Sequence, residues 1–120
     1  LSRRQRQMCI RDSLATVSAR MTDKAKALSD EEIRAVWSKA YEGQDFMVLL
    51  PEGTLPATGN IIGSNAAHLQ VVADRKAGRI YAFAAIDNLN RGTAGQAVQS
   101  LNIALGLPED AGLTKIGVAP

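Results

Sequence analysis

HLQVVADRKAGRIYAFAAID, residues 68–87, is the stretch that decides the fold class of this chain. Two runs rich in β-branched and aromatic residues stand on either side of the short turn 75–78, which contains a glycine. This pattern predicts an antiparallel β-hairpin. A doubly wound parallel sheet would alternate strands and helices regularly. The hairpin therefore favours an α+β fold, with helices on one face of a largely antiparallel or mixed sheet.

The segment before the hairpin predicts one clear helix. Ser29 and Glu32 have the spacing of a capping box. Apolar residues follow at three- and four-residue spacing up to a stop at Gly43, so we expect a helix over 30–42. Strand patterns are predicted on either side of it, over 14–21 and 45–50, with a possible further strand in NIIGSN, 60–65.

The segment after the hairpin, AIDNLNRGTAGQAVQ at 85–99, joins a strand to a helix through a polar loop with Gly92 and Gly95. The predicted helix ends at Gly106, just before Pro108. The start of a helix presents unpaired N–H groups and a partial positive charge, and glycines there let a phosphate or amide group approach the backbone. Such loops also occur without any ligand, so a purely structural role is the alternative.

The composition indicates one domain and excludes several classes of protein. The 120 residues, 46% of them hydrophobic, are enough for one domain with a core. No run approaches the ~20 apolar residues that span a bilayer, so no membrane partner is expected. The single cysteine excludes an internal disulfide framework and a cysteine-rich zinc site. These features predict a reduced, cytoplasmic protein without a metal site.

Residues 1–13 differ from the rest of the chain in charge. Four arginines against one aspartate give them +3, which leaves −1 of the total of +2 for residues 14–120. A basic surface for nucleic acid would have to lie wholly in this segment, so no nucleic-acid partner is expected. The string MCIRDS, 8–13, resembles translated sequencing-adapter DNA. We expect residues 1–13 to be non-native, or a disordered basic arm, and residues 14–120 to form the domain.

Two longer strings carry a resemblance to a known family. LPEGTLPATGNIIGSN, 50–65, and AIDNLNRGTAGQAVQSLNIALGLPEDAGL, 85–113, resemble the C-terminal part of the N-acetyl-gamma-glutamyl-phosphate reductase family. These enzymes use NADPH and belong to arginine biosynthesis. The resemblance runs from about Leu14 to the end of the chain. Aspartate-semialdehyde dehydrogenases share the shorter Asp-Asn-Leu-x-x-Gly core, but not the Gly-Ser-Asn and Gly-Leu-Pro-Glu blocks together.

The resemblance implies that residues 14–120 are part of a catalytic (dimerisation) domain of the glyceraldehyde-3-phosphate dehydrogenase type, in a homo-oligomeric enzyme. The helix that begins near Thr93 would return to pack on a Rossmann-type NADP-binding domain that is missing here. The loop before it would lie near the nicotinamide, which implies a set of NADP-binding residues: Asn88, Leu89, Gly92, Gly95 and Gln96. Ser64 and Asn65 either hydrogen-bond the acyl phosphate substrate or stabilise the turn that contains them.

The chemistry that the resemblance implies is hydride transfer coupled to acyl transfer. A cysteine thiolate attacks the γ-acyl phosphate, phosphate leaves, and a hydride from NADPH reduces the thioester to the semialdehyde, with a histidine as acid–base partner. In the family, both groups precede the region matched here. Cys9 lacks the Asn-Pro-Gly-Cys-Tyr context of the nucleophile, and His68 lies on a predicted strand. No catalytic residue is therefore assigned in this chain, which we expect to be inactive alone.

Three other interpretations stay open. A related reductase of carrier-protein-linked aminoadipyl phosphate in lysine biosynthesis would share most of these blocks. The tetrapeptide Gly-Thr-Ala-Gly, 92–95, is compatible with the GXXG clamp of an RNA-binding module, although that clamp joins two helices. A structural interaction domain is the third. In the fragment interpretation, the surface that meets the missing domain would be exposed and apolar, which favours self-association.

Overall fold

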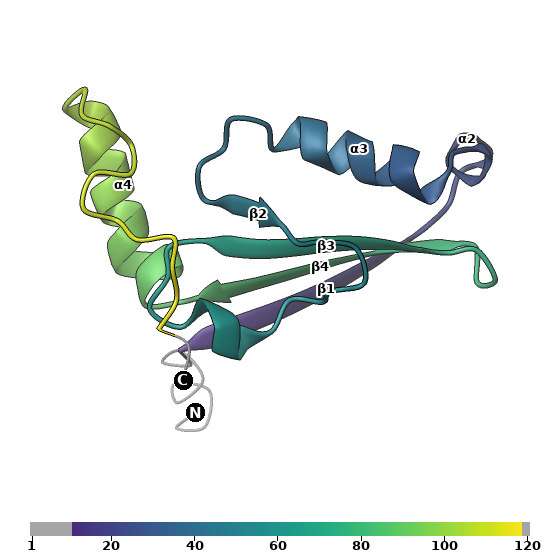
Figure 1. Cartoon of the computed structure of the whole chain (residues 1–120), viewed down its shortest axis with the longest axis horizontal. Coiled ribbons are helices and arrows are strands. Elements are labelled where there is room, and N and C mark those ends of the chain that lie inside the picture. The colour runs from purple at the N-terminus through teal and green to yellow at the C-terminus, as the bar shows by residue number, and fades with distance from the viewer. Residues whose placement is uncertain (1–10, 119–120) are drawn as a thin grey trace, which may run out of the picture.

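The sheet confirms the predicted α+β class. The computed structural model describes residues 11–118, in which four strands form one mixed sheet of order β1-β4-β3-β2 (Figure 1). The strands are β1 (Asp12–Arg20), β2 (Met47–Leu49), β3 (Ala67–Asp74) and β4 (Arg79–Asp87). β1 and β3 both run antiparallel to β4, whereas β2 runs parallel to β3. The centre of the sheet is thus the predicted hairpin.

The turn of that hairpin shows why its pattern is readable from the sequence. The register places Asp74 opposite Arg79 across the turn 75–78. The Asp74 carboxylate accepts a hydrogen bond from the Ala77 N–H at 2.9 Å, which is the local bond that aspartate makes in turns. Gly78 takes a φ of 63°, a conformation that favours glycine. Strand pattern and turn chemistry therefore specify the same structure.

The predicted helix covers one face of the sheet as α3 (Asp30–Ala40), with the short α2 (Asp23–Ala27) at its N-terminal end (Figure 1). Both arms of the capping box are present. The Glu32 N–H donates to Ser29 Oγ at 3.1 Å, and the Ser29 N–H donates to Glu32 Oε2 at 2.7 Å. The sequence does not predict α2, because five residues are too few to show a helical period.

One cluster of the core lies between α3 and the sheet, while other buried apolar residues lie outside it: Phe46, Ile61, Ala66, Ala67, Leu69 and Ala85. The buried centre of the cluster consists of Met21, Ile33 and Val71. Partly buried apolar residues pack around this centre: Ala25, Leu28, Trp37, Ala73 and Ile80. The burial of this face is what holds α3 on the sheet, since packing of an apolar face supplies most of a helix's stability in a protein.

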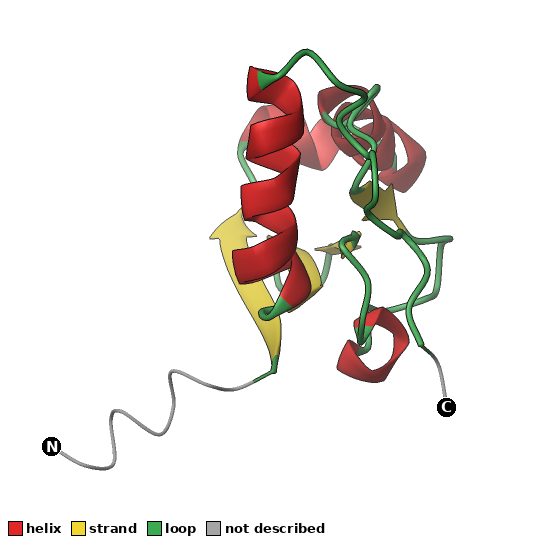
Figure 2. Cartoon of the chain, turned by 90° about the vertical axis from the view of Figure 1, so that its left-hand side faces the viewer, coloured by secondary structure: helices red, strands yellow, loops and turns green. Residues whose placement is uncertain are grey.

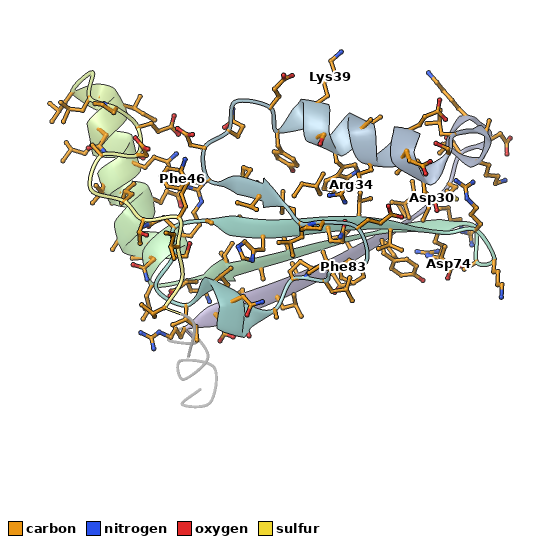
Figure 3. All side chains as sticks on the ribbon, viewed as in Figure 1. Asp30, Arg34, Lys39, Phe46, Asp74 and Phe83 are labelled. Atoms are coloured by element: carbon orange, nitrogen blue, oxygen red, sulfur yellow. The ribbon has the colours of Figure 1, made fainter. Side chains whose placement is uncertain are left out.

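The opposite face of the sheet carries aromatic residues. The rings of Tyr81 and Phe83 stack with their centroids 6.4 Å apart, and Figure 3 shows Phe83 on the side of the sheet away from α3. Together with Leu55 and Val72 they line a shallow hollow of about 560 Å³. Within the described residues, α3 packs on one face of the sheet, and the opposite face is open at this apolar hollow.

A polar bracket, which we define as Arg34 and Gln70, closes the outer edge of β3 beyond the end of β2. Gln70 is only 2% exposed, and its Nε2 donates to the carbonyls of Pro51 and Thr54 at 2.8 and 2.7 Å. Its Oε1 accepts from the Val71 N–H at 3.0 Å and from Arg34 at 2.7 Å. Figure 3 shows Arg34 between α3 and the sheet. Side chains here take the place of a neighbouring strand.

The structure departs from the predicted elements in two places. Residues 60–65 do not form a strand, because the 3₁₀ turn η2 (Thr58–Ile61) and the positive φ of Gly63, 79°, interrupt the extended chain. β1 begins at Asp12 rather than at residue 14, so two residues of the segment predicted to be non-native pair with β4. The first ten residues of that segment lie outside the described residues, and its origin stays a prediction.

The C-terminal helix α4 (Gly95–Ala104) projects from one end of the sheet (Figures 1 and 2). Val98, Leu101 and Leu105 recur at helical spacing along it and just beyond, and they are 40%, 56% and 63% exposed. This apolar stripe has the character expected of a surface that another domain covers. None of the helices between residues 11 and 118 is long and apolar enough to cross a membrane.

Candidate functional site

The candidate site lies where β4 turns into α4. We call residues 88–96 the entrance loop. Its middle is one π-helical turn, η3 (Asn90–Ala94), in which the Ala94 N–H donates to the Leu89 carbonyl at 3.0 Å. Single π-turns are frequent at functional sites. The tetrapeptide 92–95 is helical and follows a strand, so it lacks the helix–loop–helix context of a GXXG clamp.

Asp87, the last residue of β4, anchors the entrance loop. It is fully buried, and its Oδ1 accepts hydrogen bonds from the N–H groups of Leu89 and Asn90 at 2.8 and 3.1 Å. Its Oδ2 accepts from Asn90 Nδ2 at 3.0 Å and from the Gly63 N–H at 2.8 Å. Burial would raise the pKa of the Asp87 carboxyl, but these N–H donors stabilise the anion and hold the pKa below its usual value.

The two predicted substrate-binding residues, Ser64 and Asn65, face the C-terminal strap, residues 114–118. The Ser64 hydroxyl is fully buried and donates to the Lys115 carbonyl at 2.9 Å, and it accepts from the Ala66 N–H at 2.9 Å. The Asn65 N–H and Nδ2 donate to the Thr114 carbonyl at 2.8 and 3.2 Å. This geometry favours the turn-stabilising alternative, and contact with substrate stays a prediction.

Asn65 also joins the two predicted sites to each other. Its Oδ1 is buried and has no hydrogen-bond partner among the described residues. A Cβ placed on Gly95 would lie 1.7 Å from this oxygen, so the asparagine occupies the space where a side chain at 95 would stand. The close approach of Asn65 is therefore sufficient to require glycine at 95, and contact of Gly95 with NADP stays a prediction. The contact brings turn 63–65 against the entrance loop.

The other predicted NADP-binding residues divide into two groups. Leu89, Gly92 and Gln96 are exposed to solvent at the loop surface, Leu89 by 50%. Asn88 is half-buried, its Nδ2 donates to Ser13 Oγ at 3.0 Å, and its carbonyl accepts from the Thr93 hydroxyl at 2.9 Å. A ligand can thus reach the first group directly, whereas Asn88 helps to hold the loop.

A layer of cations and one aromatic ring flanks the loop. Arg91 and Lys115 both lie over the ring of Phe46, at 5.3 and 5.6 Å from its centroid, and Figure 3 shows Phe46 on the side of the molecule that faces α4. Arg91 also donates to Gln99 Oε1, and Lys115 pairs with Asp45 at 2.9 Å. Arg91 is therefore packed against the protein rather than freely solvated.

The remaining candidates from the sequence lie apart from this loop or outside the structure. His68 is a residue of β3, as predicted, and lies opposite Ala85 of β4. Cys9 is outside the described residues. Between residues 11 and 118 there is no group of three His, Cys, Asp or Glu side chains placed to hold a metal ion.

Sequence reasoning missed the role of Asp87 as an anchor. The signal was present, because an aspartate just before a helical turn often accepts the N–H groups two and three residues later. What the sequence does not reveal is the fourth donor, the Gly63 N–H, which comes from 24 residues earlier in the chain.

Comparisons with known proteins identify the family of the chain. The sequence model described as semialdehyde dehydrogenase, dimerisation domain, matches residues 6–88. The N-acetyl-gamma-glutamyl-phosphate reductase of Bifidobacterium longum (strain DJO10A) is 96% identical over 110 residues, which are 92% of this chain and 30% of that protein. Proteins with the same name from Bifidobacterium animalis subsp. lactis and Mycobacterium avium are 62% and 56% identical over the same shares. The chain spans about 30% of the length of these relatives.

Proposed function

Because the chain belongs to the semialdehyde dehydrogenase family, we propose that it is the C-terminal part of an NADPH-dependent N-acetyl-gamma-glutamyl-phosphate reductase. The intact enzyme would reduce an acyl phosphate to a semialdehyde in arginine biosynthesis. The observation that carries the proposal is the contact between Asn65 and Gly95, since it joins the two segments in which substrate- and cofactor-binding residues are predicted. The 96% identity with the Bifidobacterium longum reductases supports the same assignment.

The entrance loop fits the polar groups of a nicotinamide nucleotide. The start of a helix carries partial positive charge, although Asp87 already accepts the N–H groups of Leu89 and Asn90. The buried Asn65 Oδ1 beside it lacks a hydrogen-bond partner within the described residues. We place NADP against the exposed side of the loop, which carries Leu89, Gly92 and Gln96. Asn88 and Gly95 shape the loop from within. When bound, NADPH supplies the hydride.

The residues of this chain would orient and shield the reaction rather than take part in it. Ser64 and Asn65 hold turn 63–65 against the entrance loop, next to where we place the acyl phosphate. The nucleophilic cysteine and the acid–base histidine belong to the part of the enzyme that precedes residue 14. The isolated chain would therefore bind neither substrate completely and would have no reductase activity.

Two apolar surfaces would be covered in the intact enzyme. The stripe on α4, with Val98, Leu101 and Leu105, would pack on the NADP-binding domain. The open face of the sheet, with Tyr81 and Phe83, would meet a second copy of the chain in a homo-oligomer, in agreement with the dimerisation domain that the family is named for. We further propose a cytoplasmic location, as for an enzyme of amino-acid biosynthesis.

The test is a chimera. This chain replaces the matching segment of the Bifidobacterium longum reductase, and NADPH-dependent reduction of N-acetyl-gamma-glutamyl phosphate is measured beside the chain alone. We expect activity from the chimera and none from the 120-residue chain. A folded chimera without activity would contradict the proposed function, and turnover by the chain alone would contradict the placement of the nucleophile elsewhere. A preference for an aminoadipyl phosphate would favour the lysine-pathway alternative.

A further inference from the structure

Asp87 joins two segments that are distant in sequence. Its Oδ2 atom accepts at once from the Gly63 N–H, at 2.8 Å, and from Asn90 Nδ2, at 3.0 Å. Gly63 precedes the pair Ser64 and Asn65, whereas Asn90 opens the π-helical turn of the entrance loop. One buried oxygen atom is therefore the direct polar link between turn 63–65 and the entrance loop.

The link requires a carboxylate. Asp87 accepts four hydrogen bonds, all of them from N–H groups, and no cation pairs with it in the described residues. A carboxylate has acceptors on both oxygens, which matches four donors. An asparagine has the same shape, but its NH₂ group would face N–H donors on one of the two sides. Asp87→Asn therefore removes the hydrogen-bond acceptor for one of the two segments, turn 63–65 or the entrance loop, without creating a cavity.

The position of Asp87 makes this link rigid. It is the last residue of β4, the central strand that pairs with both β1 and β3, and it is fully buried. The entrance loop can therefore shift relative to turn 63–65 only if hydrogen bonds to a buried anion break. Loss of such bonds is costly, because the donors and the charge would be left without partners. The close contact of Asn65 with Gly95 depends on this arrangement.

We propose that Asp87 is a positioning residue of the reductase, which holds the coenzyme-facing entrance loop in register with the substrate-facing turn 63–65. This inference rests on the proposed function. It assigns Asp87 no contact with substrate or coenzyme. Its role is to fix the distance between the entrance loop, where we place the coenzyme, and turn 63–65, where we place the substrate. Reaction rates are sensitive to displacements of about 1 Å between reacting groups.

Asp87→Asn in the chimera tests the proposal kinetically. We expect kcat to fall by about 10- to 100-fold, with higher KM values for both NADPH and the acyl phosphate. A residue that acts only on stability would lower the amount of active enzyme and leave both KM values unchanged. The matched control is Asp74→Asn at the other end of the same hairpin, where one N–H is accepted in an exposed turn, and we expect parental kinetics.

A second readout does not depend on activity. Amide hydrogen exchange in the 120-residue chain should become faster in Asp87→Asn on the side that faces the new NH₂ group, at Gly63 or at Leu89, while the amides of α3 keep their parental rates. If the exchange of neither segment changes, or if the chimera keeps parental KM values, the positioning role is wrong. An inactive parental chimera with faster exchange at one of the two segments would contradict the proposed function but not the link itself.

Asn90→Ala covers the case in which Asp87→Asn does not fold. It removes one donor from Oδ2 and leaves the carboxylate and its bond to Gly63 intact. We expect a higher KM for NADPH, faster exchange in the entrance loop and an unchanged KM for the acyl phosphate. Parental values for all three quantities would overturn the proposal.

Discussion

His68 illustrates at the residue scale how a single side chain can mislead a search for function. It is the only histidine of the chain, and it lies half-buried on β3 between Val48 and Ala85. Its Nδ1 atom is buried without a hydrogen-bond partner in the described residues. Burial lowers the pKa of the His68 imidazole, because the charged form loses water and gains no partner. The ring is therefore a neutral part of the sheet at neutral pH.

A pH-dependent stability follows from His68. Its folded-state pKa lies below the unfolded value of about 6.5, so the unfolded chain binds the proton first. The contribution of His68 to stability is fully present above about pH 6.5 and is lost as the pH falls through the lower folded-state value. We expect His68→Gln to reduce the change in unfolding free energy between about pH 7 and pH 5.

Urea denaturation at a series of pH values measures this effect. Each protein gives a slope of unfolding free energy against pH. Because His68→Gln leaves no histidine in the chain, the difference in slope between the parental chain and this variant is due to His68. Equal slopes would show that the imidazole has the same pKa in the folded and unfolded states. Asp87 also makes the fold less stable as the pH falls, but in a more acidic range. Because its folded-state pKa is lowered, the ionised carboxylate stabilises the fold above about pH 4, and this contribution is lost as the pH falls further.

At the scale of elements, the position of α4 depends on one close contact. Gly95 has an ordinary helical φ of −66°, so its backbone would accept any residue. The restriction comes from its surroundings, because a Cβ would lie 1.7 Å from Asn65 Oδ1 and 2.8 Å from the Asn90 carbonyl oxygen. The helix α4, the π-turn η3 and turn 63–65 thus pack together at Gly95 so closely that no space is left there for a methyl group.

Gly95→Ala should therefore lower the free energy of unfolding by about 1–3 kcal/mol, the usual effect of forcing extra atoms into a packed site. Gly92→Ala is the matched control in the same loop. Its Cβ would meet its nearest neighbour at 3.7 Å, and we expect unchanged or slightly higher stability. Urea midpoints followed by circular dichroism give both values. Equal destabilisation by the two substitutions would contradict the contact.

The elements themselves were largely predictable, and the reasons are local. The capping box of α3, the turn of the β3-β4 hairpin and the stop at Gly106 each depend on residues that are neighbours in the sequence. The π-turn η3 and the 3₁₀ turn η2 were not predictable, because distant partners fix them. The Gly63 N–H donates to Asp87, and Ser64 and Asn65 donate to carbonyls of the C-terminal strap. The sequence thus indicated which residues lie near the site, but not which of them are hydrogen-bonded to each other.

At the scale of the whole molecule, the described residues leave apolar surface exposed in two places. One is the stripe on α4 and the other is the open face of the sheet. Their exposure agrees with a chain that spans about 30% of its relatives. Water-exposed stripes of this kind drive association of a chain that lacks its natural neighbours.

We expect Leu101→Lys to weaken self-association of the isolated chain, because it places a charge in the middle of the α4 stripe, where Leu101 is 56% exposed. Val36→Lys on α3 is the matched control, since Val36 is 60% exposed but lies on a different element. Sedimentation velocity across a range of concentrations measures the mass of both variants. An equal effect of both would mean that association is not localised on α4. In the chimera, Leu101→Lys should also lower thermal stability.

The bracket of Arg34 and Gln70 has a consequence for how this chain meets other strands. Gln70 Oε1 already accepts the hydrogen bond of the Val71 N–H, beyond the end of β2. Natural sheets avoid fibres by blocking such rims. An incoming strand therefore finds no free donor at Val71, and the bracket hinders pairing along this part of β3.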